Sequence, residues 1–373
     1  MKCRSIAAAI IVALAPSAVP RTAAQAAEPP PEIAVNRGVV QLETARASSI
    51  SVRIAEDLAS IIDDGATRRV LPVVGKGSLQ DLTDLKLLRG IDMAILQLDV
   101  LDYARQQNLL PGIESWVTYI AKLYNEEFHL LARKDITRVT DLANQKVNVD
   151  LRSAGTAITA ARLFDLLKVR VTTTNDDQEA ALERLRNGEI AGLCFVSGKP
   201  APIFRGLDGN DGFHFLALPL DPAVTAAYMP TQLTAADYPV LVPSDQPVDT
   251  VAVGTVLVAA NLHVGSERYR NLVNFVEAFF GGFQTLLDRG HHPKWREVNI
   301  SAELPRWRRF PPAEQWLQRN APVAAAPMPQ DLKAIFSRFI DERQKAAGGP
   351  LPTQQQKDEL FRQFQRWQGG QHQ

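Results

Sequence analysis

Small, hydroxyl-bearing and positively charged residues follow short apolar segments of this sequence, a pattern typical of a ligand site built on loops. The segment Ser153-Ala154-Gly155-Thr156 is the clearest example, because it lies between a strand-like stretch, 147–149, and a helix-like stretch, 157–167. Backbone N–H groups at a helix N-terminus are free and lie at the positive end of the helix dipole, so such a loop can bind a carboxylate. An ordinary N-cap with a turn glycine is the alternative interpretation.

Four other segments have equivalent places after apolar stretches, at residues 44–48, 75–78, 97–99 and 197–199. In open α/β sheets ligands bind beyond the carboxyl ends of the strands, so we expect these loops to meet at one cleft. Arg or Lys in such loops favours an anionic ligand, although each could equally be a solvated surface charge or pair with a nearby acid. The residues expected to bind the ligand are Arg46, Ser48, Lys76, Ser78, Gln97, Asp99, Arg152, Ser153, Gly155, Thr156, Ser197, Lys199 and Tyr228.

Motifs of the common enzyme and metal-site classes are absent from the sequence. It has no nucleophile elbow, no H-E-x-x-H, no Walker loop and no dinucleotide-binding glycine fingerprint. Glu126 and His129 have a spacing seen in metal sites, but on a strand their side chains would face opposite ways. We therefore expect no catalytic residues, no metal and no cofactor. An enzyme remains an alternative, because catalytic groups can be assembled from distant parts of a chain.

Short apolar strands alternate with amphipathic helices, which predicts an α/β fold. The first units are strand 38–42, helix 50–62, strand 69–74, helix 79–89 and strand 92–96. Residues 117–124 and 128–132 predict two longer strands, the second crossing into another lobe. Near Tyr228 the chain is expected to return, and 248–260 predicts a strand that rejoins the first lobe.

The N-terminus has the pattern of a cleavable signal peptide, which predicts export to the periplasm. Lys2 and Arg4 precede an apolar stretch, 6–19, and Ala24-Gln25-Ala26 provides a small-x-small cleavage site. An uncleaved anchor is the alternative, although the stretch is short for a membrane span. Lys+Arg and Asp+Glu are both 41, so the chain lacks the excess positive charge that nucleic-acid binding requires.

These features predict how the chain is divided. The expected parts are a signal peptide (1–26), the first part of lobe 1 (33–125), lobe 2 (126–228), the return of lobe 1 (229–320), and a linker with C-terminal amphipathic helices (321–373). The C-terminal helices are expected either to pack on the body or to dock a partner. We expect the protein to be a monomer.

The segments 72–101, 120–160 and 181–202 resemble solute-binding subunits of tripartite ATP-independent periplasmic (TRAP) transporters, specifically the TAXI family, and 237–258 and 292–299 extend the resemblance. The resemblance implies a type II periplasmic-binding-protein fold, with two α/β lobes joined by a hinge and a ligand cleft between them. It also implies a receptor for a small anionic solute, either a glutamate-like amino acid or a dicarboxylate, and membrane subunits of the transporter as partners.

One segment departs from the family pattern. The family has a glycine-rich loop followed by a tyrosine after its first strand, whereas residues 44–51 here read TARASSIS. Without glycines the backbone cannot approach a ligand as closely, which predicts a divergent branch with altered ligand contacts. Two other functions remain open: a ligand sensor that signals to a membrane kinase, and an enzyme on the same fold.

Overall fold

The computed structural model describes residues 37–47, 49–209, 211–320, 336–337, 340–341 and 352–369. The expected signal peptide, the Pro/Ala-rich linker and most of the first C-terminal stripe lie outside these residues. The strands are β1 Val39–Thr44, β2 Arg69–Val74, β3 Ile91–Gln97, β4 Val117–Arg133, β5 Lys146–Asn148, β6 Thr172–Thr174, β7 Gly192–Ser197, β8 Phe213–Phe215, β9 Met229–Leu233 and β10 Val248–Ala260.

The helices fill the connections between these strands and follow the last of them. They are α2 Ser51–Ile62, α3 Ser78–Leu87, α4 Leu98–Gln106, α5 Ile113–Trp116, α6 Gly155–Leu166, α7 Gln178–Arg186, α8 Pro222–Ala227, α9 Glu267–Gly281, α10 Pro311–Asn320 and α12 Gln354–Gly369, with short 3-10 helices η1 Val139–Leu142, η2 Pro202–Phe204, η3 Phe283–Leu287 and η4 Pro293–Glu297. In the described part of the chain, no helix combines the length and apolar character that a bilayer crossing requires.

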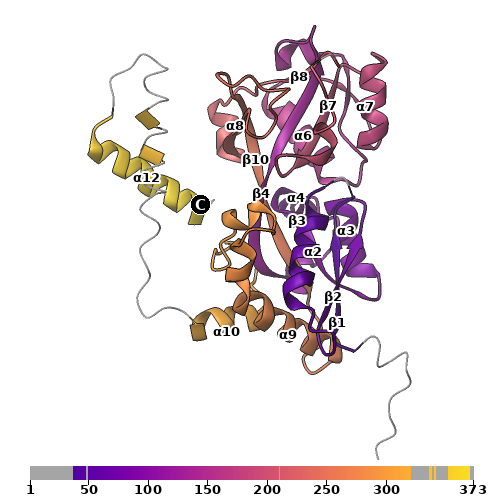
Figure 1. Cartoon of the computed structure of the whole chain (residues 1–373), viewed down its shortest axis with the longest axis vertical. Helices are drawn as coiled ribbons and strands as arrows, with labels where there is room; N and C mark the ends of the chain where they lie inside the picture. The colour runs from indigo at the N-terminus through magenta and orange to yellow at the C-terminus, as the bar shows by residue number, and fades with distance from the viewer. Residues whose placement is uncertain are drawn as a thin grey trace, which may run out of the picture. The chain divides into compact units, whose positions relative to one another are not determined.

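One sheet of ten strands runs through the body in the order β2-β1-β3-β10-β4-β7-β5-β6, with β8 paired to β4 and β9 to β10. The long strands β4 and β10 are antiparallel and extend through both halves of this sheet (Figure 1). We call the half with β1, β2 and β3 the first lobe, and the half with β5 to β9 the second lobe. Two α/β lobes joined by two crossing strands confirm the expected type II fold.

The crossing differs in detail from the sequence prediction. We expected separate strands over 117–124 and 128–132, but β4 is continuous, because residues 125–127 pair with Gly254, Val253 and Ala252 of β10. We placed the return to the first lobe at residue 229. In the structure β9 pairs with the first residues of β10, and Tyr238 packs among second-lobe aromatic side chains, so the chain re-enters the first lobe within β10.

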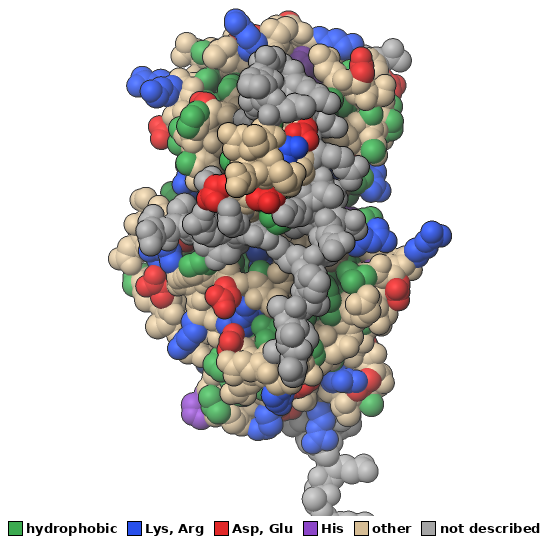
Figure 2. Space-filling model, turned by 90° about the vertical axis from the view of Figure 1, so that its left-hand side faces the viewer, with side chains coloured by type: hydrophobic (Ala, Val, Ile, Leu, Met, Phe, Trp, Pro, Cys, Tyr) green, Lys and Arg blue, Asp and Glu red, His purple; other side chains and the backbone are tan. Residues whose placement is uncertain are grey.

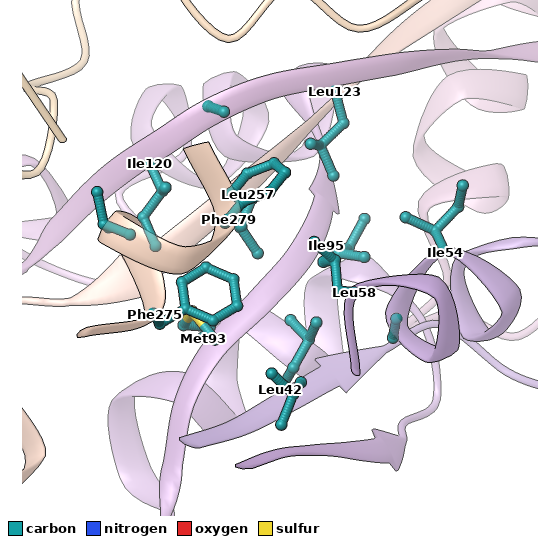
Figure 3. Close-up of a cluster of buried hydrophobic side chains, with 14 of the residues drawn as sticks. Leu42, Ile54, Leu58, Met93, Ile95, Ile120, Leu123, Leu257, Phe275 and Phe279 are labelled. Carbon is teal, nitrogen blue, oxygen red and sulfur yellow. The ribbon is translucent and has the colours of Figure 1, made fainter. Parts of the chain in front are cut away.

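The core of the first lobe packs α2 and α9 against the sheet. Ile54 and Leu58 of α2 lie four residues apart, which places both on one face of the helix, and neither is exposed to solvent. Burial of such apolar surface is the main stabilising contribution to this lobe. Figure 3 shows the cluster, whose labelled members are Leu42, Ile54, Leu58, Met93, Ile95, Ile120, Leu123, Leu257, Phe275 and Phe279.

The second lobe has a core on each face of its sheet. Successive side chains of β7 point to opposite faces, as in any strand. Cys194 packs with Leu163 of α6, whereas Leu193 packs with Leu185 of α7. Cys194 is a buried free thiol, and burial raises its pKa well above the usual range. The helices on both faces hold the ends of β5 and β7 in fixed positions.

Candidate functional site

A small cavity lies where the strand ends of the two lobes face each other. Its volume is about 30 Å³, space for only about two or three water molecules. The lobes are in direct contact around it, for example between Arg46 and Asp150. The loops after β1, β2 and β5 contribute to it, together with β3, β7 and the crossing strands. It is lined by Ala45, Arg46, Ser49, Ser51, Gly77, Ser78, Ile95, Leu96, Gln97, Glu126, Asp150, Ala154, Gly155, Thr156, Phe195, Val196 and Thr255.

Five of the residues predicted from the sequence line this cavity: Arg46, Ser78, Gln97, Gly155 and Thr156. They come from both lobes, as the strand-end rule requires. The side chain of Thr156 also has a structural role, because its Oγ1 accepts a hydrogen bond of 3.1 Å from the N–H of Val196. This bond attaches the start of α6 to β7.

The other predicted residues lie elsewhere. Lys76 and Arg152 are exposed, and Lys199 donates from Nζ to the carbonyl oxygen of Gln232 at 2.6 Å within the second lobe. Tyr228 donates to Asp99 at 3.3 Å, and both residues line a separate groove. Ser153 contributes its backbone carbonyl to a contact between the two lobes. Ser197 is buried, and its Oγ has no hydrogen-bond partner among the described residues. Ser48 lies outside the described residues.

An ion pair crosses the cleft between the lobes. Arg46, on the loop after β1, donates to the Asp150 carboxylate at 2.8 Å. The Asp150 side chain is 3% exposed, and its backbone φ of +70° lies in the left-handed region. Burial raises the pKa of Asp150, and the Arg46 charge opposes that rise. The sequence left open whether each loop cation would bind a ligand or pair with a nearby acid; in this structure Arg46 pairs with Asp150.

A second polar contact forms the floor of the cavity. Gln97 Nε2 donates to Glu126 Oε2 at 2.7 Å, and both side chains are buried. Burial raises the pKa of Glu126 to about 7, with the Gln97 hydrogen bond opposing the rise. The backbone N–H of Gln97 donates to Ser78 Oγ at 3.1 Å, which fixes this serine beside the end of β3. The sequence analysis named Glu126 for its spacing to His129 and did not list it with the ligand-binding residues, but the structure places it in the cavity lining.

The N-terminus of α3 contacts the second lobe directly. The N–H groups of Leu79 and Gln80 donate to the carbonyl oxygen of Ser153 at 3.1 and 3.3 Å. Gly77 permits this approach, because a Cβ atom at Gly77 would lie 2.8 Å from Cα of Ala154. Gly77 also has a φ of +113°, which side-chain-bearing residues rarely adopt.

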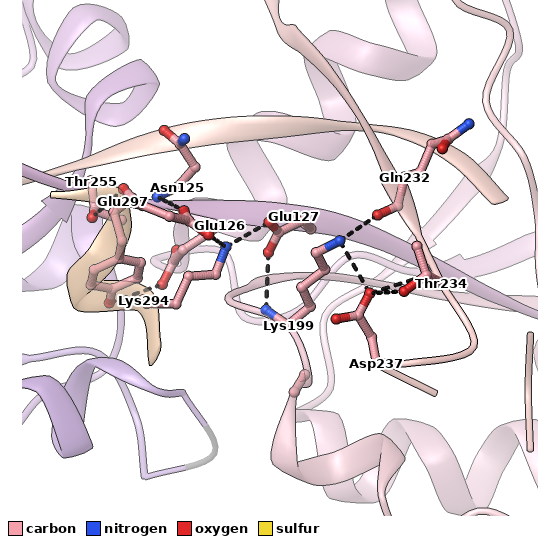
Figure 4. Close-up of polar contacts among 12 residues, drawn as sticks. Asn125, Glu126, Glu127, Lys199, Gln232, Thr234, Asp237, Thr255, Lys294 and Glu297 are labelled. Carbon is pink, nitrogen blue, oxygen red and sulfur yellow. Dashed lines mark hydrogen bonds and ion pairs between the residues drawn. The ribbon is translucent and has the colours of Figure 1, made fainter. Parts of the chain in front are cut away.

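A buried charge network lies beside the cleft at the crossing strands (Figure 4). Lys294 Nζ on η4 donates to Glu127 Oε1 of β4 at 2.6 Å and also lies 2.8 Å from Glu297. The backbone N–H of Lys199 donates to the other Glu127 oxygen at 2.9 Å. Burial raises the pKa of Glu127 against the opposing charge of Lys294. Glu127 thus connects a first-lobe segment to a second-lobe loop.

On the face that Figure 2 shows, Lys and Arg side chains and Asp and Glu side chains are both scattered over the coloured surface. Within the described residues, no cluster of three or more His, Cys, Asp or Glu side chains is arranged to hold a metal ion.

A family model described as the NMT1-like family matches residues 43–272, from the end of β1 into α9. The chain belongs to the NMT1-like family. The matched segment contains every residue that lines the cleft cavity. The sequence has no match among curated proteins.

Solved structures similar to this NMT1-like chain include several solute-binding proteins. A TctC solute-binding protein from Polaromonas is 14% identical over 67% of this chain and 88% of its own, with a TM-score of 0.40. The periplasmic binding protein BugD is 12% identical over 76% and 94%, with a TM-score of 0.47. The alkanesulfonate-binding protein SsuA from Xanthomonas axonopodis pv. citri, bound to MOPS, is 12% identical over 85% and 95%, with a TM-score of 0.42.

Proposed function

We propose that this chain is a periplasmic solute-binding receptor that captures a small anionic solute between its two lobes. The observation that carries the proposal is the convergence of Arg46 and the N-termini of α3 and α6 on one interlobe cavity. A guanidinium can bind a carboxylate through two parallel hydrogen bonds, and helix N-termini offer N–H groups to its oxygens. A glutamate-like amino acid or a dicarboxylate has the required chemistry.

The hinge of this receptor is the pair of crossing strands. The cavity of about 30 Å³ is too small for a dicarboxylate, so the lobes must separate before a solute enters. Bending at β4 and β10 would open the cleft without disturbing either core, because the two strands are the sheet connection between the lobes. Closure over the solute would then present a surface to a membrane partner.

The remaining features of the proposal follow from the sequence. A cleavable signal peptide over residues 1–26 would export the chain to the periplasm. The resemblance to TAXI-family subunits makes membrane subunits of a TRAP-type transporter the proposed partners. Ser78, Gln97, Gly155 and Thr156 are the proposed ligand contacts besides Arg46, since all four line the cavity.

A thermal-shift screen tests this function. The chain from residue 27 to residue 373 is heated with amino acids, dicarboxylates, keto acids and aromatic acids. A ligand that binds only the folded state adds about 2.7 kcal/mol of stability at a concentration of 100 Kd, so one anionic class should raise the melting temperature by several degrees.

Replacement of Arg46 provides the matched comparison. Arg46→Ala should abolish the ligand-induced shift, whereas Arg133→Ala, which removes a surface pair with Asp135, should preserve it. The function is contradicted if no compound shifts the wild-type chain, or if Arg46→Ala responds as the wild type does.

A further inference from the structure

We propose that Asp150 is an internal competitor of the ligand, whose carboxylate occupies the place of a ligand carboxylate on Arg46 and helps to hold the ligand-free cleft closed. The proposal rests on the proposed function for the assignment of Arg46 as the ligand's cation. It adds that the protein itself supplies oxygen atoms to ligand-binding groups at two points of the cleft, and leaves a buried oxygen unpaired at a third.

The first point is the Arg46–Asp150 pair. The two residues lie 104 positions apart in the sequence, on loops of different lobes, and their side chains are 2.8 Å apart. Arg46 is the cation that opposes the rise in the pKa of Asp150, so separating the lobes would remove that stabilisation from a carboxylate that is 3% exposed when paired. A charge-assisted hydrogen bond of this kind is stronger than a neutral one.

The second point is the N-terminus of α3. An anion is the usual ligand of free N–H groups at such a position. Here the carbonyl oxygen of Ser153 accepts from the N–H groups of Leu79 and Gln80. Ser153 belongs to the loop that follows Asp150, so the same second-lobe segment supplies oxygen atoms to both first-lobe donors.

The third point is the N-terminus of α6, which faces Gln97 of the first lobe. Gln97 is 6% exposed, and Nε2 donates to Glu126. Oε1 of Gln97 lies against Gly155: a Cβ atom added to this glycine would be only 1.6 Å from it. It is buried and has no hydrogen-bond partner among the described residues. An unpaired buried acceptor is unfavourable, so a ligand that displaces it removes that cost.

The first two of these contacts, the Arg46–Asp150 pair and the Ser153 carbonyl at α3, favour closure without ligand. A ligand must first meet an open cleft, and its apparent affinity falls in proportion to the fraction of open molecules. A carboxylate that reaches Arg46 must also displace Asp150. Weakening the Arg46–Asp150 contact should therefore increase both the open fraction and the affinity for an anion.

The test measures the distance between the lobes in the ligand-free full chain. Spin labels are placed at Glu56→Cys on α2 and Glu183→Cys on α7, both exposed positions, in a chain with Cys3→Ser; Cys194 is buried and stays unlabelled. Asp150→Asn removes the charge while keeping the side-chain size, and asparagine tolerates the left-handed φ. Asp176→Asn is the matched control, because Asp176 pairs with Arg184 inside the second lobe.

Electron–electron double resonance should give one short label-to-label distance for the wild type and the control. Asp150→Asn should show a second population with a longer distance, and its open-to-closed ratio should be about tenfold higher. A wild type that is already open, or an Asp150→Asn distribution identical to that of the control, would overturn the proposal. These distances need no ligand, so this proposal and the proposed function can fail independently.

Binding provides the second readout, with succinate and L-glutamate as probes. Asp150→Asn should bind the anion about tenfold more tightly than Asp176→Asn does, because its competitor is gone. Weaker binding by Asp150→Asn would show that Asp150 contacts the ligand rather than competing with it, and would also overturn the proposal.

Discussion

Glu126 lies on β4 at the floor of the cleft and is 4% exposed. Burial favours its neutral form and raises its pKa from 4.5 to about 7. The folded chain therefore binds a proton at this site more tightly than the unfolded chain. The resulting stability is fully present below about pH 4.5 and is lost as the pH rises through about 7.

A glutamine at this position should remove that dependence. We expect the free energy of unfolding of the wild type, relative to Glu126→Gln, to fall by on the order of 2 kcal/mol between about pH 5 and 8. Urea denaturation across this pH range measures the difference in free energy of unfolding. Glu303→Gln, a change at an exposed glutamate, is the control. Parallel curves for wild type and Glu126→Gln would contradict the assignment of the raised pKa.

Helix α6 begins at a direct contact between the lobes, and the glycine at its first position makes room for Gln97 there. A Cβ atom on Gly155 would lie 1.6 Å from Gln97 Oε1 and 3.2 Å from Val100 Cγ2. The start of α6 is also attached to β7 through Thr156. The helix therefore cannot move away from a new side chain without breaking its contact with the sheet.

Gly155→Ala should therefore lower the melting temperature, and Gln97→Ala in the same chain should restore part of the loss. The two substitutions should show a coupling energy of at least about 1 kcal/mol in a double-mutant cycle, since they change atoms in direct contact. Thermal or urea unfolding of the four chains measures it. Additive effects would show that the lobes do not meet at Gly155 in solution.

At the scale of the whole molecule, the Lys294–Glu127 pair connects the segment after α9 to the crossing strand. Both side chains are 4% exposed, and the partners are 167 residues apart in sequence. An isolated charge left at this depth is far more costly than a paired one. The segment around Lys294 is further held by Trp295, which is fully buried and donates to Asp57 at 2.9 Å.

Removing only one charge of the Lys294–Glu127 pair should lower the free energy of unfolding more than removing both charges. Lys294→Met should lower the free energy of unfolding by about 3–5 kcal/mol, because Glu127 loses its cation, and adding Glu127→Gln should recover part of the loss. Arg319→Met, which breaks an exposed pair with Glu277, should cost at most about 1 kcal/mol. Guanidinium unfolding measures all three; equal losses in the single and double variants would contradict an ion pair at this site.

Local patterns in the sequence determined the elements and the edge of the sheet where the site lies. The spacing of Ile54 and Leu58 predicted α2, and apolar runs predicted β1, β2 and β3, because these patterns depend on neighbours along the chain. The rule that ligands bind beyond strand ends placed Arg46, Gln97 and Gly155 together, as the cavity lining has them.

Only the tertiary structure decided which partners these residues have. Arg46 pairs with Asp150 and Lys199 with Asp237, whereas the sequence left open whether either cation would bind a ligand, pair with an acid or face solvent. The sequence also could not predict the continuity of β4 or the Glu127–Lys294 pair, because each depends on segments far apart in the chain. Charge pairing is decided by burial and by the closeness of the two lobes, and neither is a property of local sequence.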